Sequence, residues 1–260
     1  MSEEEKDQGI PVAPVEGKMF LYEQPELLTV DDHGALGVTP PPRPFDFAAK
    51  VRAIPLVVSE IASAQRNYPI IFSDMENPVP LAVVGLSENS NLFVDAQGRW
   101  DQDAYVPAYL RCHPFALAVT GDEKFAVVVD RAAPSVGENA EYPFFDGQEM
   151  ASNTKAMVDF CGKYEGERRK TIEYVERLKA LELLGPRRAT HKVPGSDEEQ
   201  TIASYIAVVP EKLGDLPAET VKELNDRGML AVTYAHLFSL ENWLRLLERH
   251  QRVTTAVTSH

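Results

Sequence analysis

The most distinctive stretch of the sequence runs from Gly85 to Phe115 and gathers aromatic rings and guanidinium groups over a short distance. The candidate ligand-binding residues in it are Arg99, Trp100, Tyr105, Tyr109 and Arg111. An arginine offers a planar fork that matches a carboxylate, and a tryptophan offers a face for stacking. These residue types together favour a site for a carboxylate, a sugar or a peptide.

The same residues have a structural alternative, because buried aromatic side chains more often pack a core than bind a ligand. Trp100 and Tyr105 would then cover a sheet edge, while Arg99 and Arg111 would pair with nearby acids. The candidate acids are Asp95, Asp101 and Asp103. The two hypotheses differ in geometry, since a binding site requires the side chains to converge on one pocket.

Catalytic and metal-binding patterns are missing from the sequence. A nucleophilic Cys112 would need a base within reach, and the side chain of its neighbour His113 diverges from it on a helix or strand. The histidines form no H-x-x-x-H or H-x-H pair, and no C-x-x-C or glycine-rich nucleotide motif occurs. We therefore assign no catalytic residue, metal or cofactor, and expect a binding or accessory role rather than an enzyme.

The net charge and the N-terminal sequence limit which partners and which cellular compartment are expected. The net charge of −14 argues against nucleic acid, because phosphate binding needs a cationic face. We expect a protein or peptide partner, or a small anionic ligand. Residues 1–18 read as a disordered acidic tail without the apolar segment of a signal peptide, and no apolar run is long enough to span a bilayer. These features predict a cytoplasmic protein that does not insert into membranes.

Alternating and β-branched patterns predict strands in the first half of the chain. The predicted strands are Met19–Tyr22, Ala53–Val58, Pro69–Ser73, Val79–Leu86, Asn91–Val94, Pro114–Thr120 and Phe125–Asp130. Their short connections suit antiparallel pairing, and one short helix, capped by Ser59, interrupts the series.

Helices dominate after Tyr142, with a helix predicted from near Gly147 that Gly162 and Gly166 could divide in two. The last part of the chain has the pattern of a β-α-β-α unit. Its predicted elements are strands Ile202–Val209 and Met229–Ala235, helix Pro217–Arg227, and a final helix capped by Ser239. The apolar stripe of that final helix, Leu240, Trp243, Leu244 and Leu247, predicts a buried Trp243.

These elements predict an α+β fold, in which a mostly antiparallel sheet from about residue 50 to 130 packs against helices from the C-terminal half. We expect residues 19–260 to form a single domain, with residues 200–250 as a possible subdomain. The two cysteines, Cys112 and Cys161, are too few for a disulfide framework and are expected to be free thiols.

Three phrases of the sequence, in order, resemble the bacterial SapC family. They are FDFAAKVRAIPLVVSEIASAQRNYPIIFS from Phe45 to Ser73, PLAVVGLSENSNLFVDAQGRWDQDAYVPAYLRCHPFALA from Pro80 to Ala118, and GMLAVTYAHLFSLENWLRLLERH from Gly228 to His250. Cys112-His113 departs from the basic or aromatic pair expected there, and Pro134–Phe145 fits the pattern poorly. The resemblance implies a link to surface-layer or outer-membrane uptake systems, and it carries over no catalytic residue.

Overall fold

The computed structural model describes residues 19–120, 124–192 and 198–258, and it confirms the α+β prediction. The central sheet has five strands in the order β12-β13-β4-β5-β3, and each neighbouring pair is antiparallel. Its strands are β3 (Ala53–Pro55), β4 (Ile70–Phe72), β5 (Pro80–Val83), β12 (Leu184–Lys192) and β13 (Glu199–Val208). The sheet therefore draws on the chain well beyond residue 130.

A second, three-stranded sheet has the order β1-β7-β6. It consists of β1 (Pro25–Leu27), β6 (Phe115–Thr120) and β7 (Lys124–Asp130). Beside it lie a small sheet of β2 (Leu36–Val38), β8 (Val136–Glu138) and β9 (Tyr142–Pro143), and a hairpin of β10 (Phe145–Asp146) and β11 (Glu149–Met150).

The helices are concentrated in the second half of the chain. They are α1 (Val30–His33), α2 (Ile61–Ala64), α3 (Ala108–Cys112), α4 (Ser152–Ala180), α5 (Pro210–Gly214), α6 (Ala218–Asp226), α7 (Met229–Ser239) and α8 (Asn242–Thr258), with 3-10 turns η1 (Asp46–Ala48) and η2 (Val58–Glu60). The prediction of a helix over Pro217–Arg227 is confirmed by α6, with Pro217 at its N-cap.

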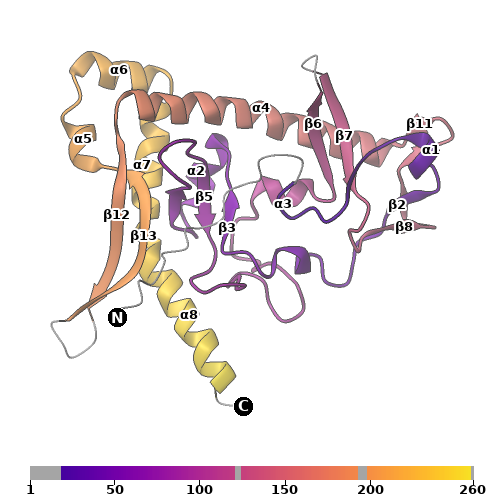
Figure 1. Cartoon of the computed structure of the whole chain (residues 1–260), viewed down its shortest axis with the longest axis horizontal. Helices are drawn as coiled ribbons and strands as arrows, with labels where there is room; N and C mark the ends of the chain where they lie inside the picture. Colours follow the sequence, from indigo (N-terminus) through magenta and orange to yellow (C-terminus); the bar gives the residue numbers. More distant parts are fainter. Residues whose placement is uncertain (1–18, 121–123, 193–197, 259–260) are drawn as a thin grey trace, which may run out of the picture.

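Helix α4 runs along both sheets and joins two cores (Figure 1). Its C-terminal part buries Tyr174, Val175 and Leu178 against the central sheet, and its N-terminal part buries Cys161 against β6 and β7. The predicted break at the two glycines is wrong, since α4 is one helix of 29 residues. A mid-helix glycine costs only about 1 kcal/mol, and packing at both ends offsets that cost.

The segment Met229–Ala235 is helical rather than a strand, so the β-α-β-α prediction is wrong. A continuous apolar run fits a buried helix as well as a buried strand, and α7 packs between α6 and α2. Ser239 ends α7 instead of capping α8, and its hydroxyl accepts a hydrogen bond of 3.0 Å from the Ile70 amide. Residues of β13, α7 and α8 join the same core cluster as β3–β5.

The apolar face of α8 also differs from the predicted stripe. Trp243 is buried, as expected, and its ring lies 5.1 Å from that of Tyr205. Leu244 is 53% exposed, however, and Leu246 takes its place in the core. The buried positions of its first turns are Asn242, Trp243 and Leu246, and beyond them α8 extends away from the body (Figure 1).

Three further segments depart from the sequence patterns. Residues 19–22 form a turn, with Leu21 at φ 68°, rather than a strand. Asn91–Val94 is also a turn, because the Asn91 side chain bonds the Ala48 carbonyl and the Phe93 amide in place of a strand ladder. Near Gly147 a hairpin replaces the predicted helix start. Residues 1–18, predicted as a tail, lie outside the described residues.

Candidate functional site

The structure divides the five predicted binding residues between two regions. Tyr105, Tyr109 and Arg111 gather around α3 where it meets α4, whereas Arg99 and Trp100 lie near α8. The five side chains therefore do not converge on one pocket.

In the region near α8, the Trp100 ring packs in the core. Trp100 is buried and its ring lies 5.6 Å from Phe45 and 6.1 Å from Phe93. Arg99 is exposed and donates from Nε to Asp95 at 3.0 Å, the pairing that the structural alternative predicts. Asp101 pairs instead with Arg249 of α8. These contacts tie the 93–101 loop to α8, and Arg99 and Trp100 also line a cavity there with Arg249 and Val253 of that helix.

In the first region, a buried carboxylate organises the predicted residues. Glu60 accepts hydrogen bonds from the Tyr105 hydroxyl at 2.8 Å, the Ala108 amide at 2.6 Å and the Val57 amide at 3.0 Å. Burial raises the pKa of Glu60, although these hydrogen bonds oppose the effect. The Arg111 guanidinium donates to the Tyr105 oxygen at 3.2 Å. Glu60 thus holds the start of α3 and positions both predicted side chains.

Arg111 itself remains on the surface. It lies 5.0 Å from the ring centre of Phe160 on α4 and 5.7 Å from that of Tyr105. Burial and the neighbouring Glu60 carboxylate raise the pKa of Tyr105 to about 12, so the phenol stays protonated. This corner therefore offers one exposed cation above an aromatic surface.

Beside this corner, between α3, α4 and β6, lies a cavity of about 270 Å³. Its walls are mainly apolar and come from β6, the ends of β3 and α3, the turn before β5, and one face of α4. Polar atoms come from Tyr22, Tyr109, Cys112, Cys161, Tyr164 and Glu165. Ile172, 48% exposed, and Arg168 also line it, so the cavity reaches the surface along α4.

Most polar atoms of the cavity already have partners. The Tyr22 hydroxyl donates to the Phe115 carbonyl at 2.6 Å, and the Cys161 thiol donates to the same carbonyl at 3.7 Å. The Tyr109 hydroxyl bonds the Phe20 carbonyl. The Tyr164 hydroxyl has no hydrogen-bond partner within residues 19–120, 124–192 and 198–258, and burial raises its pKa well above the usual range. The phenol of Tyr164 therefore keeps its proton.

At the mouth, Glu165 and Arg168 form a two-pronged ion pair with both N–O distances at 2.7 Å. Arg169 approaches the same carboxylate at 3.9 Å. The Glu165 side chain is buried, while both arginines are about half exposed. The positive charge nearest the entrance therefore belongs to arginines that the buried acid holds in place.

A family model described as SapC matches residues 28–246. The chain belongs to the SapC family. No curated protein and no solved structure matches it. In this SapC-family chain, the first and second of the three phrases supply the walls from β3, α3 and β6. Helix α4, the turn before β5 and the segment around Met19 and Tyr22 supply the rest.

Sequence reasoning missed the α4 side of the cavity in this SapC-family protein. Tyr164 and Cys161 lie on the helix predicted after Tyr142, but nothing in the sequence shows which element their face of the helix meets. Cys112 and His113 do diverge as expected. The thiol enters the cavity, while the imidazole stacks on Phe47 at 4.0 Å and contacts Asp130 at 3.3 Å.

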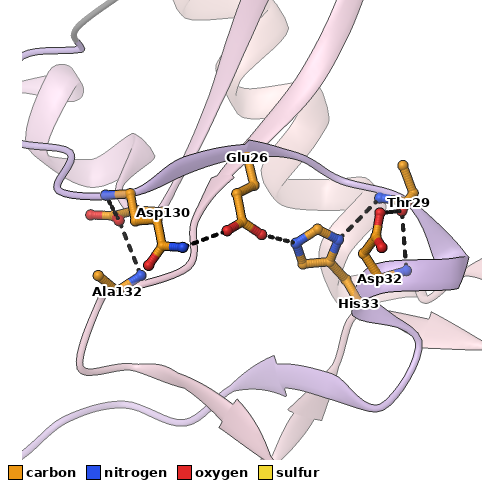
Figure 2. Close-up of polar contacts among 7 residues, drawn as sticks. Glu26, Thr29, Asp32, His33, Asp130 and Ala132 are labelled. Atoms are coloured by element: carbon orange, nitrogen blue, oxygen red, sulfur yellow. Dashed lines mark hydrogen bonds and ion pairs between the residues drawn. The ribbon is translucent and has the colours of Figure 1, made fainter.

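A chain of polar contacts around β1 and α1 was also missed (Figure 2). His33 is buried, and its Nδ1 accepts from the Thr29 amide at 3.3 Å. Since Nδ1 accepts, Nε2 carries the proton and donates to Glu26 at 3.2 Å. Gln24 extends the chain from Glu26 to Asp130. Both ring nitrogens of His33 thus have hydrogen-bond partners. The network is structural, and neither nitrogen is free to act as a base.

The part of the chain that the structure describes contains neither a metal-binding cluster nor a membrane-spanning helix. Those residues contain no group of three or more His, Cys, Asp or Glu side chains that would hold a metal ion. Among the described helices, none is both long and apolar enough to cross a bilayer.

Proposed function

We propose that this protein binds a small, largely apolar molecule in the cavity between α3 and α4. The observation that carries the proposal is an apolar cavity of about 270 Å³ that reaches the surface and contains one unpartnered hydroxyl. Ligand sites are concave and mostly apolar, with few polar groups that fix orientation. The proposal is one of binding, without a catalytic step.

The size and lining of the cavity define the class of ligand. An apolar cavity of roughly 150 Å³ holds benzene, so this larger one has room for a one- or two-ring aromatic or a short branched chain. Tyr164 would donate to one acceptor on the ligand. Arg168 at the mouth suits a ligand whose polar or anionic end remains near the surface.

Titration with the fluorophore phenylnaphthylamine tests the proposal. We expect saturable binding with one site per chain. Ile172→Trp should block the mouth and abolish the fluorescence gain, because Ile172 is exposed at the cavity rim. Glu173→Trp is the matched control, because Glu173 is next to Ile172 on α4 and is exposed, but does not line the cavity. Equal binding by both variants would place the probe elsewhere and reject the cavity.

The role of Tyr164 is tested with two ligands of similar shape. Tyr164→Phe should weaken binding of acetylnaphthalene about 5-fold, the effect of one lost neutral hydrogen bond. Binding of naphthalene, which has no acceptor, should stay unchanged. An equal loss for both ligands would mean that the hydroxyl shapes the cavity rather than contacting the ligand.

A second proposal concerns the cellular role: a non-catalytic accessory of a surface-layer or outer-membrane uptake system, acting from the cytosol on a protein or peptide partner. Membership of the SapC family supports it. Cross-linking in the native host, followed by purification and mass spectrometry, should recover a reproducible partner from such a system. Recovery of the protein without any reproducible partner would reject this role while leaving ligand binding in the cavity untouched.

A further inference from the structure

The cavity contains both cysteines of the chain, although they are 49 positions apart in sequence. Cys112 ends α3 and Cys161 lies on α4, and both are buried, with 4% and 2% of their surface exposed. The two side chains pack in the same buried cluster, and each thiol affects the pKa of the other. The fold therefore places two free thiols against each other at the wall of a space that is open to small molecules.

The surroundings give the two sulfur atoms different properties. The neighbouring Cys112 thiol lowers the pKa of Cys161, whereas Cys161 and burial raise the pKa of Cys112. Hydrogen bonding to a thiolate stabilises it, and the thiolate is the form that reacts with oxidants. Cys161 is accordingly the sulfur prepared to attack first, and Cys112 is the one placed to follow.

We propose that Cys112 and Cys161 form a reactive dithiol, which hydrogen peroxide entering the cavity converts into an intramolecular disulfide. The proposal goes beyond ligand binding and does not depend on it, because it needs only that a molecule as small as peroxide enters. The cavity is several times larger than the share of roughly 30 Å³ that a water occupies in the liquid.

The reaction balances with hydrogen peroxide as the oxidant. The Cys161 thiolate attacks one peroxide oxygen, so an S–O bond forms and the O–O bond breaks. The departing hydroxide takes up the proton that the Cys161 thiol had lost, and a sulfenic acid and water result. The Cys112 sulfur then attacks the Cys161 sulfur, the S–O bond breaks, and the second hydroxide leaves as water with the Cys112 proton. Two thiols are oxidised and one peroxide is reduced.

The disulfide would change the wall of the cavity. It would bring the sulfurs to about 2.05 Å and link the end of α3 covalently to α4. It would also remove the thiol proton that Cys161 donates to the Phe115 carbonyl, leaving Tyr22 as a donor to that oxygen.

The experiment uses the full, reduced chain treated with hydrogen peroxide and analysed by intact-mass and non-reducing peptide mapping. We expect a mass loss of about 2 Da, one peptide linking residues 112 and 161, and full reversal by dithiothreitol. The same treatment in urea is the comparison, and the cross-link should form faster in the folded chain. The proposal is overturned if folded protein yields no such peptide, or if it forms only after unfolding.

Single-thiol variants test the order of attack. Cys112→Ser should stop at a sulfenic acid on Cys161 that a dione probe labels, whereas Cys161→Ser should show little labelling at Cys112. The reverse pattern would overturn the assignment of Cys161 as the attacking sulfur. Far-ultraviolet circular dichroism verifies that both variants fold, and phenylnaphthylamine binding is measured in parallel. Loss of the cross-link and loss of probe binding are separate results, so the two proposals fail independently.

Discussion

The Tyr105 hydroxyl and the Glu60 carboxylate lie 2.8 Å apart and connect the start of α3 to the turn that precedes α2. The same carboxylate accepts from the amides of Ala108 and Val57, so one buried acid satisfies three donors from two segments. Buried donors that lose their acceptor are expensive to leave unpaired.

Glu60→Ala should therefore destabilise the protein strongly. We expect a loss of about 3 kcal/mol in the free energy of unfolding, since several buried donors lose a charged acceptor at once. Urea denaturation followed by circular dichroism measures the change. Glu173→Ala on the exposed face of α4 is the control and should stay near the wild-type midpoint. A midpoint for Glu60→Ala that matches the control would show that water replaces the carboxylate.

His236 makes stability depend on pH. It is fully buried, its Nε2 accepts from the Val208 amide at 3.1 Å, and burial lowers its pKa to about 4. In the unfolded chain the pKa of His236 is ~6.5, so the unfolded chain binds the proton more readily than the folded chain. The stability contribution is therefore complete above about pH 6.5 and is lost as the pH falls toward 4, by about 3 kcal/mol in total.

Urea denaturation midpoints measured between about pH 7 and pH 4, on both sides of the ordinary histidine pKa of ~6.5, test this dependence. His236→Gln keeps an acceptor for the Val208 amide and does not titrate. The variant should lose less stability than the wild type over the acid range, because other groups still respond. Parallel curves for the two proteins would contradict a neutral, buried His236.

Trp243→Ala should remove much of the contact between α8 and the core. The side chain is 4% exposed, so we expect a loss of about 3–5 kcal/mol, the range for large buried aromatics. Leu244→Ala is the matched control on the same helix, because Leu244 is 53% exposed. Its effect should stay within about 0.5 kcal/mol. Similar losses in both variants would point to a general weakening of α8.

Arg99→Ala and Arg111→Ala should both leave the melting temperature nearly unchanged. Both side chains are exposed, and an exposed ion pair such as Arg99–Asp95 adds little to stability. Thermal melts of the two variants check this directly. A large loss in either variant would show that the guanidinium organises the fold around it, through the 95–99 turn for Arg99 or the Glu60 and Tyr105 contacts for Arg111.

The sequence predicted most strands of both sheets because their β-branched runs are short and bounded by turn residues. It did not predict β12, whose residues 184–192 include three basic side chains and a proline and become a strand through pairing with β13. It also misassigned Met229–Ala235, where every face of the element is apolar and periodicity therefore carries no information.

The candidate site was predictable only in part, for a geometric reason. Tyr109 and Cys112 come from the stretch that the sequence singles out, but Cys161, Tyr164 and Glu165 face them from α4. A pairing between distant segments leaves no trace in the local pattern of either one. Trp100 shows the converse, since the residue most suggestive of ligand stacking packs against Phe93 in the core.

Helix α4 is shared by the two cores of the molecule. With 29 residues it is about 43 Å long, and each of its halves completes a different core. Separate unfolding of either sheet would expose the half of α4 that covers it, so the two regions should melt as one cooperative unit. The cavity lies against the middle of that helix, so a molecule held there would contact the one element that packs in both cores.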